Sequence, residues 1–369
     1  MNPIRGLGLR SGVKRADAER YLLSMLLSFA ASVVLTRVYL QLAGYPQIGG
    51  GELHIAHILW GGLLLFASAL LMLTLANRWV LQLCAILTGV GVGLFIDEVG
   101  KFITTNNDYF YPAAAPIIYG FFLLTVWLYL RVRRGTERDV RRELSQALEY
   151  LSEIVDDDLD QRERAEIDTR LQRIATRATA PDQIQLATSL LQFIRRDDLH
   201  LGQPVAGRRE RFIQQLQRFE LKYISRRAAR TVIVIGLLAF GVLAIQDLLP
   251  IARAVFWPDF AGDLGAAIAS AGLVRSVNGL LWYLARQTLE GLVGLMLIVG
   301  AGLLIFNREN LGVIIGYFGL LLYLLTVNLL VLYFDQFTTI LLTVLQFGLF
   351  MAVIRYRQRY LTPSLTRHL

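Results

Sequence analysis

The chain has 369 residues, 55% of them hydrophobic, and its mean hydropathy is +0.49. These values exclude an ordinary soluble protein, and repeated uncharged runs of about 20 residues predict membrane-spanning helices. The single cysteine, Cys84, excludes a disulfide framework and a metal site built from cysteines. The net charge of +8 does not indicate nucleic-acid binding, because most basic residues fall on one predicted side of the membrane.

The N-terminal part of the chain predicts four spans. A basic segment, 1–20, precedes an apolar run that is too long for a signal-peptide core and has no cleavage site of small residues after it. We therefore expect an uncleaved first span, and three further apolar runs follow it. The four predicted spans cover residues 21–44, 54–76, 79–101 and 112–130, which together form a first membrane domain over residues 1–130.

Residues 131–230 change character and predict a helical domain outside the membrane. Charged residues are frequent there, and apolar residues recur at helical spacing. Pro181 marks the start of one of its helices. Two of the predicted apolar faces are Ile167, Leu171 and Ile174, and Leu186, Leu190 and Phe193.

The C-terminal part, residues 231–369, predicts a second membrane domain. Its four spans are expected at residues 231–249, 285–306, 310–334 and 336–355, and the connection 250–284 is expected to hold a helix lying at the outer interface. Both halves have an Asn-Arg turn after their second span, which is compatible with an internal repeat. The predicted fold class is thus all-α, a polytopic membrane protein with about eight helices in two four-helix halves around a helical cytoplasmic domain.

The distribution of charge predicts the orientation. Most of the 37 Lys and Arg residues lie before the first span, in the segment 131–230, in the tight turns or after the last span. The exceptions, on or near the other side, are Arg37, Lys101, Arg253, Arg275 and Arg286. By the positive-inside rule, both termini face the cytoplasm of a bacterial or archaeal cell, in the cytoplasmic (inner) membrane.

The predicted functional site lies where the second and third spans meet the outer surface. His57 at the start of one span and Glu98 at the end of the next return to nearly the same depth. Ionisable residues at such depth are costly and usually functional, so we predict that His57 and Glu98 act as an acid and base.

A metal ion is one alternative at this site. His54 and His57 are three residues apart and share a helix face, and Asp97 and Glu98 could complete a shell of nitrogen and oxygen ligands. The sequence does not identify a cofactor. One interpretation is a divalent metal held by these four residues. The other interpretations are hydrogen-bonding histidines at a helix interface and proton acceptors without metal.

Further charged residues point to the same side. Lys101 follows Asp97 by four residues, so we expect these two to pair, whereas Glu98 has no local partner unless Arg37 supplies one. Arg37, Lys101 and Arg286 are predicted to hold an anionic group. Asp108 and Glu290 are additional candidates for substrate binding, although Arg286 and Glu290, four residues apart, could simply pair with each other.

The order of these residues resembles the VanZ-like family of small bacterial membrane proteins, over about residues 50–130. A His at the outer start of one span, a glycine-rich next span and an acid at its outer end carry the resemblance. It maps the family's His and Glu onto His57 and Glu98, and its later acid onto Asp108, while Lys101 stands where the family has Gln. The family's Lys before the His, and its downstream Arg, have no counterpart here.

Three functions are compatible with this pattern. We expect binding or processing of an envelope lipid or its headgroup at an outward-facing His and carboxylate pocket. A proton-linked or ion-linked transporter would use the same groups as a relay, and a structural or signalling subunit needs none of this chemistry. The predicted partner is membrane lipid and not nucleic acid, while protein partners of the cytoplasmic domain and a homo-oligomer stay open.

Overall fold

A computed structural model describes residues 14–15, 17–44, 56–133, 140–155, 161–196, 225–256 and 277–361. Within these residues eight helices are long and apolar enough to cross a membrane, and no strand occurs, so the predicted all-helical polytopic fold is confirmed. The predicted interfacial helix falls mainly on residues outside this range.

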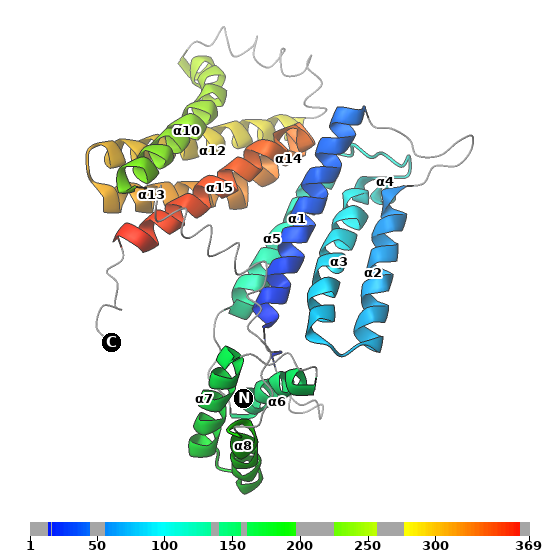
Figure 1. Cartoon of the computed structure of the whole chain (residues 1–369). Helices are drawn as coiled ribbons and strands as arrows, with labels where there is room; N and C mark the ends of the chain where they lie inside the picture. The colour runs from blue at the N-terminus through cyan, green and yellow to red at the C-terminus, as the bar shows by residue number, and fades with distance from the viewer. Residues whose placement is uncertain are drawn as a thin grey trace. The chain divides into compact units, whose positions relative to one another are not determined.

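The first group of spans is α1 (Ala18–Ala43), α2 (His57–Thr74), α3 (Arg78–Asp97) and α5 (Ala114–Arg133), with the short α4 (Val99–Ile103) between the last two. They lie side by side (Figure 1). Three short helices follow: α6 (Val140–Val155), α7 (Gln161–Arg177) and α8 (Pro181–Ile194).

The second group consists of α10 (Arg226–Phe256), α12 (Val277–Ile305) and a long span that runs from Glu309 to Asp335, followed by the last span. The long span is α13 (Glu309–Leu322), a π-helix (Tyr323–Val327) and α14 (Asn328–Asp335). A 3₁₀ turn (Gln336–Thr339) leads into α15 (Ile340–Tyr356), which ends in a second π-helical stretch (Arg357–Leu361). Each predicted span therefore corresponds to a helix, with ends that differ by a few residues.

The internal contacts fall into two compact units. The first comprises Met1–Phe29, Gly62–Val92 and Thr125–Gln215, and the second comprises Ala30–Gly61, Gly93–Leu124 and Leu216–Leu369. The second unit thus holds one end of α1, α2, α3 and α5, together with α4 and the helices from α10 onward. Every residue of the candidate site described below belongs to this second unit.

In the first unit, close packing of α1 on α3 depends on Gly89. A Cβ atom added there would lie 1.9 Å from Ser28 Oγ and 2.3 Å from the Met25 carbonyl oxygen. At the start of α3, Arg78 pairs with Asp17 and lies over the Tyr150 ring, with its guanidinium carbon 4.5 Å from the ring centroid. A larger residue at position 89 would push the two helices apart.

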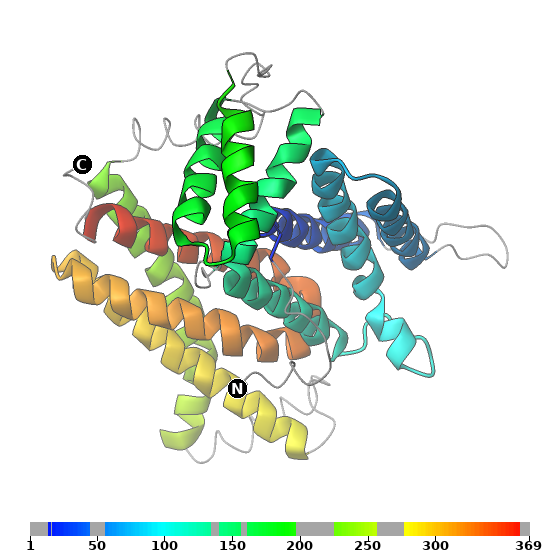
Figure 2. The same cartoon turned by 90° about the horizontal axis from the view of Figure 1, so that it is seen from below.

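Helices α6, α7 and α8 pack on one another around a small apolar core (Figure 2). Ile167, Leu171 and Ile174 are fully buried, which confirms the predicted face of α7. The predicted face of α8 is wrong, because Leu186 and Phe193 are about two-fifths exposed. The buried face of α8 is one residue further on, at Ala187, Leu191 and Ile194, where the small Ala187 side chain lets α8 approach α7.

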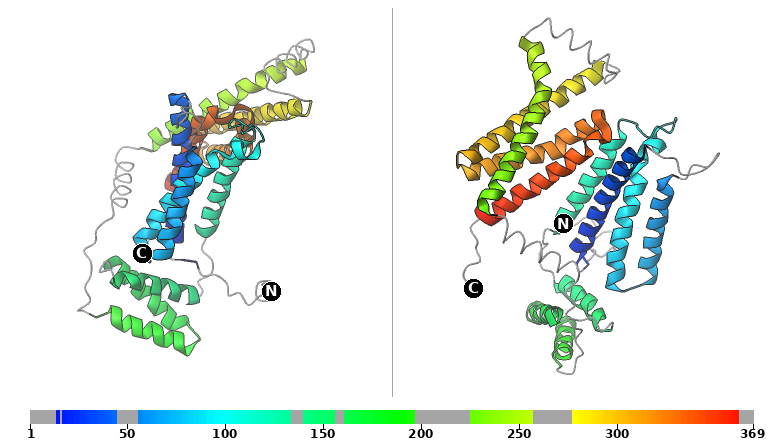
Figure 3. Two further views of the ribbon diagram at one scale, coloured as in Figure 1. Left: turned by 90° about the vertical axis from the view of Figure 1, so that its right-hand side faces the viewer. Right: turned by 45° about the horizontal axis from the view of Figure 1, so that its top comes forward.

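In the second unit, α10 and α12 cross in close contact (Figure 3). A Cβ atom on Gly294 of α12 would lie 2.7 Å from Ala244 Cβ and 2.9 Å from the Gly241 carbonyl oxygen of α10. Small residues let the two backbones approach, as is usual between membrane helices. Fully buried leucines, Leu237, Leu297 and Leu304 among them, extend this contact into the main apolar core.

Candidate functional site

The site is built on a break in the third span. Helix α3 ends at Asp97, Glu98 leaves the helical conformation (φ −92°, ψ 10°), and α4 begins at Val99. Gly100 fits α4 against the following turn, since a Cβ there would lie 2.7 Å from the Asp108 carbonyl oxygen. The break places two consecutive carboxylates, both at most 1% exposed, at the end of the membrane helices.

Arg37 of α1 binds the first carboxylate. Its Nε lies 2.5 Å from Asp97 Oδ1, and its Nη2 donates to the Asp97 carbonyl oxygen at 2.9 Å. Arg37 is 2% exposed and Asp97 is 0% exposed, so this ion pair is buried. A buried pair of this kind is costly to break from either side, because the remaining charge would have no equivalent partner.

His57, the first residue of α2, bridges the two carboxylates. Its Nε2 lies 3.0 Å from Asp97 Oδ2, and its Nδ1 lies 3.0 Å from Glu98 Oε1. Carboxylates only accept hydrogen bonds, so the imidazolium form, which donates from both nitrogens, satisfies both contacts. The predicted close approach of His57 and Glu98 is confirmed, and both acids face one histidine from its two sides.

Lys101 pairs with Glu98 and not with Asp97 as predicted. The Nζ atom lies 3.4 Å from Glu98 Oε1. The prediction of an Asp97–Lys101 pair assumed a continuous helix, and the break at Glu98 changes the faces that residues 97 and 101 present. The expectation that Glu98 lacks a local partner is wrong for the same reason, and Arg37 is bound to Asp97 instead.

Tyr109 completes the cluster, and its role was not predicted from the sequence. Its hydroxyl donates to Asp97 Oδ2 at 2.8 Å. Its ring lies 4.3 Å from the guanidinium carbon of Arg37 and 5.2 Å from Lys101 Nζ, both distances to the centroid. Two cations on one aromatic ring are a favourable arrangement in a poorly solvated place.

Asp108 positions this tyrosine. Its Oδ1 accepts a hydrogen bond from the Phe110 amide at 2.9 Å, and its own amide donates to Thr104 Oγ1 at 2.8 Å. These contacts fix the turn that presents Tyr109 to Asp97. The predicted role of Asp108 in substrate binding stays a prediction, while its contacts here are those of a turn residue.

Exposure divides the six residues of this cluster, which we call the His57 cluster: Arg37, His57, Asp97, Glu98, Lys101 and Tyr109. The side chains of His57 and Lys101 are 22% and 24% exposed, whereas both carboxylates and Arg37 are buried. The accessible part is therefore cationic. With His57 protonated, three cations face two carboxylates, so these six residues carry one net positive charge.

Two other predicted residues lie elsewhere in the second unit. Arg286 and Glu290 of α12 line a separate cavity, where their side chains lie 3.5 Å apart and Arg286 also binds Asp335. The pairing that their spacing allowed is present, and their role in substrate binding stays a prediction. The structure gives them no place in the His57 cluster.

The metal prediction is not decided by this geometry. His54 lies outside the described residues, and no group of three or more His, Cys, Asp or Glu side chains arranged to hold a metal ion occurs within the described part of the chain. Both nitrogens of His57 are instead in hydrogen-bond contact with carboxylates. A divalent metal held by His54, His57, Asp97 and Glu98 stays a prediction.

The pKa of Glu98 reflects competing effects. Burial raises it, but the hydrogen bond with His57 and the charges of His57 and Lys101 outweigh burial and leave the pKa below its ordinary value of 4.5. The pKa of Tyr109 is raised, mainly by burial and by the Asp97 charge. Tyr109 therefore remains a hydrogen-bond donor and Glu98 a carboxylate at neutral pH.

The lowered pKa of Glu98 predicts how stability changes with pH. A group with a depressed folded-state pKa stabilises the fold above its unfolded pKa, and this stabilisation is lost as the pH falls through the folded value. From about pH 6 to about pH 3, the unfolding temperature in detergent should fall more steeply for the wild type than for Glu98→Gln. Glu166→Gln, which removes a half-exposed carboxylate from α7, is the control and should follow the wild type. Equal slopes for the wild type and Glu98→Gln would contradict the ionised Glu98.

In comparisons with known proteins, no family model, no curated protein and no solved structure matches this chain.

Proposed function

We propose that the chain is a membrane protein that binds the anionic headgroup of an envelope lipid at the His57 cluster. The observation that carries this proposal is the exposure of the cluster, since His57 and Lys101 are partly accessible while the carboxylates are buried. An approaching group therefore meets positive charge and hydrogen-bond donors first. Phosphate and carboxylate groups are the ligands that fit such a surface.

The surroundings of the cluster favour an amphiphile over a free anion. Large apolar side chains next to the cluster in sequence are strongly exposed. They are Leu59 and Trp60 on α2, Phe102 and Ile103 at the end of α4, and Phe110 beside Tyr109. At the end of a membrane span, such side chains contact acyl chains while charged groups beside them reach the headgroup layer.

Processing of the headgroup would need a proton donor and an acceptor, and His57 and Glu98 are the pair in position. Protonated His57 has two N–H groups and donates one to each carboxylate. The Oε2 atom of Glu98 is buried and accepts no hydrogen bond from the described residues, so it is available to a donor group on a ligand. In this proposal Arg37 and Tyr109 are positioning residues that hold Asp97 against His57.

Lipid binding tests the proposal with one matched pair of variants. Lys101→Gln should weaken binding of short-chain phosphatidylglycerol by ~10-fold, as expected for loss of one charge-assisted hydrogen bond. Arg131→Gln, on the far end of α5, removes a cation that likewise lies over an aromatic ring, 5.3 Å from Trp127, and should bind like the wild type. Titration calorimetry in detergent, with phosphatidylcholine of equal chain length as the reference lipid, measures both. Equal affinity for the two lipids would contradict the proposal.

Proton-linked transport is the rival function, because a histidine between two carboxylates is also a proton relay. The rival predicts pH-driven solute movement in proteoliposomes, whereas the headgroup proposal predicts selective lipid binding without it.

The orientation is part of the proposal and can be tested by labelling. Asn106 and Gln161 are both exposed, and the native Cys84 is buried. A membrane-impermeant maleimide should label Asn106→Cys in intact cells and Gln161→Cys only after permeabilisation. Asn106 is preferable to Asn107, whose φ of 53° would strain a cysteine. Labelling of both variants in intact cells would contradict this orientation.

A further inference from the structure

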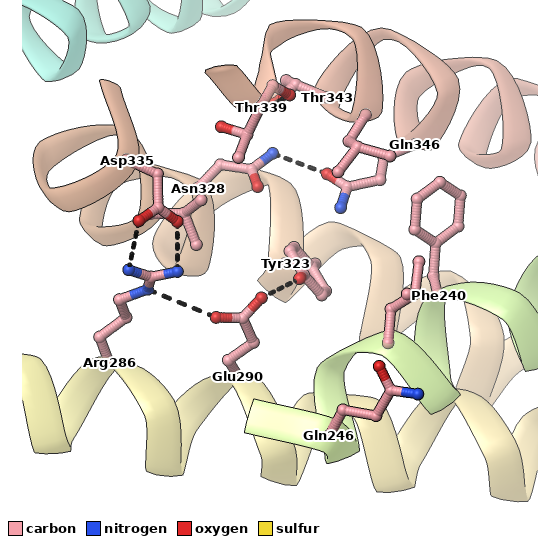
Figure 4. Close-up of a pocket in the computed structure, with 13 residues that line it drawn as sticks. Phe240, Gln246, Arg286, Glu290, Tyr323, Asn328, Asp335, Thr339, Thr343 and Gln346 are labelled. Atoms are coloured by element: carbon pink, nitrogen blue, oxygen red, sulfur yellow. Dashed lines mark hydrogen bonds and ion pairs between the residues drawn. The ribbon is translucent and has the colours of Figure 1, made fainter. Parts of the chain in front are cut away.

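A second polar site lies among the C-terminal helices, and it shares no residue with the His57 cluster. It is a cavity of about 220 Å³ lined by α10, α12, the π-helix, α14, the 3₁₀ turn and α15 (Figure 4). A water molecule occupies roughly 30 Å³ in the liquid, and drug-sized ligands need cavities of roughly 300 Å³ or more. The space therefore suits a small solute or a partly hydrated ion.

Negative charge exceeds positive charge among the described residues that line the cavity. Arg286 supplies the single cation, and Glu290 and Asp335 are two carboxylates. Arg286 Nη1 lies 3.1 Å from Asp335 Oδ1 and Nη2 lies 2.5 Å from Asp335 Oδ2, while Nε lies 3.5 Å from Glu290 Oε2 (Figure 4). One guanidinium is thus shared between two acids. Glu290 is 5% exposed, and an excess negative charge at such a position favours a bound cation.

Three of the neutral lining side chains, those of Tyr323, Thr343 and Asn328, have an oxygen that can accept, whereas the Gln346 oxygen already accepts from Asn328. Tyr323 donates its hydroxyl proton to Glu290, and Thr343 donates to the Thr339 carbonyl oxygen at 3.3 Å. A hydroxyl oxygen that donates its proton keeps its capacity to accept. Asn328 donates from its amide nitrogen to Gln346 at 2.9 Å, which also leaves its amide oxygen as an acceptor group. Oxygen acceptors around one carboxylate are the ligands that hard cations prefer.

The backbone of the span that lines the cavity also indicates a binding site. The span is α-helical except at Tyr323–Val327, where it forms a π-helix directly before Asn328. Tyr323, the first residue of the π-helix, and Asn328, directly after it, both line the cavity. Single π-helical turns within α-helices occur often at functional sites.

We infer that this cavity binds a small monovalent cation, with Glu290 as its charged ligand and Tyr323, Asn328 and Thr343 as neutral oxygen ligands. The cation is an alkali ion or the ammonium group of a small amine. Arg286 and Asp335 close the charged side of the cavity. The site is independent of the headgroup proposal, because it shares no residue with the His57 cluster.

Cation-dependent thermal stability of the purified full chain in detergent tests this inference. At constant ionic strength, with N-methylglucamine as the bulky reference cation, Na⁺, K⁺ or methylammonium should raise the unfolding temperature with a saturable concentration dependence. A response to Na⁺ or K⁺ identifies an alkali ion, and a response to methylammonium alone identifies an amine. An unfolding temperature that is the same in all four salts would overturn the inference.

Two glutamate variants make the test specific to the cavity. Glu290→Gln should raise the half-saturating cation concentration by at least ~10-fold. Glu309→Gln is the matched control, because Glu309 also accepts from a tyrosine hydroxyl, that of Tyr356 at 2.9 Å, and from an arginine, but does not line the cavity. Its response should equal that of the wild type, and an equal loss in both variants would overturn the inference. If Glu290→Gln fails to fold, Thr343→Val replaces it, with a weaker cation response expected and an unchanged response counting against the site.

Discussion

Asp97→Asn is expected to lower the free energy of unfolding by about 3–5 kcal/mol, the typical cost of breaking a buried ion pair from one side. The Asp97 carboxylate accepts from Arg37 Nε on Oδ1, and from His57 and the Tyr109 hydroxyl on Oδ2. An asparagine side chain has one acceptor oxygen, and its amide nitrogen would face donors instead. The Arg37 guanidinium would also stay buried beside a neutral group.

A double variant separates charge from shape in this prediction. Arg37→Gln alone should be similarly destabilising, while Arg37→Gln combined with Asp97→Asn removes both charges and should recover part of the loss. Asp108→Asn is the control, since the Asp108 carboxylate accepts only the Phe110 amide among its described contacts and asparagine can do the same. Denaturation in mixed micelles measures all four proteins. Strict additivity of the two single effects would show that Arg37 and Asp97 do not act as a pair.

His57→Gln is expected to weaken binding of an anionic headgroup by ~10–100-fold, since it removes a charge-assisted donor from the accessible face of the cluster. The remaining members would then carry two cations against two carboxylates. Glutamine is close to histidine in size, so the headgroup affinity should fall while the unfolding temperature changes little. Calorimetric titration with short-chain phosphatidylglycerol measures this change in affinity.

Glu98→Gln is the informative partner of this variant because, unlike His57→Gln, it should not weaken headgroup binding. Removing a buried carboxylate leaves the cluster with more positive charge, so headgroup affinity should rise or stay equal. Any turnover that depends on Glu98 as a base should be lost at the same time. Parallel losses of affinity in His57→Gln and Glu98→Gln would indicate that the cluster only stabilises the fold.

The sequence was sufficient to predict that His57 and Glu98 meet, but not to predict which charged residues form ion pairs there. Two apolar runs joined by Asn77-Arg78 required His57 and Glu98 to lie at matched depth, and the structure confirms their contact. The pairing depended on the break at Glu98, which no proline or start signal for α4 marks in the sequence. A continuous helix therefore gave the wrong partner for Lys101.

Tyr109 shows a second limit. An aromatic residue beside a span is usually part of the interfacial belt, so the sequence favoured that role. Asn107 has a φ of 53° and Asp108 caps the next turn, and together they turn the Tyr109 side chain back toward Asp97. The Asn-Asn-Asp run predicts a turn, but it does not predict which side chain the turn directs toward Asp97.

The cavity among the C-terminal helices could be recognised only from the three-dimensional structure. The sequence placed Arg286, Glu290 and Asp335 toward one end of their spans, and the pairing of Arg286 with Glu290 was one of the alternatives that their spacing allowed. The sequence could not show that Asp335 also binds Arg286, because that contact depends on how α12 packs against α14. The π-helix at Tyr323–Val327 likewise arises within an uninterrupted apolar run.

A density map of the full chain in nanodiscs of phosphatidylglycerol would test the headgroup site most directly. We expect phosphate density within about 3 Å of the Lys101 ammonium and a His57 nitrogen, with acyl density along Leu59, Trp60 and Phe102. The same map in phosphatidylcholine nanodiscs should lack an ordered headgroup there. A map in which His57 and Lys101 contact only acyl chains, or in which both lipids give equal headgroup density, would contradict the proposed function.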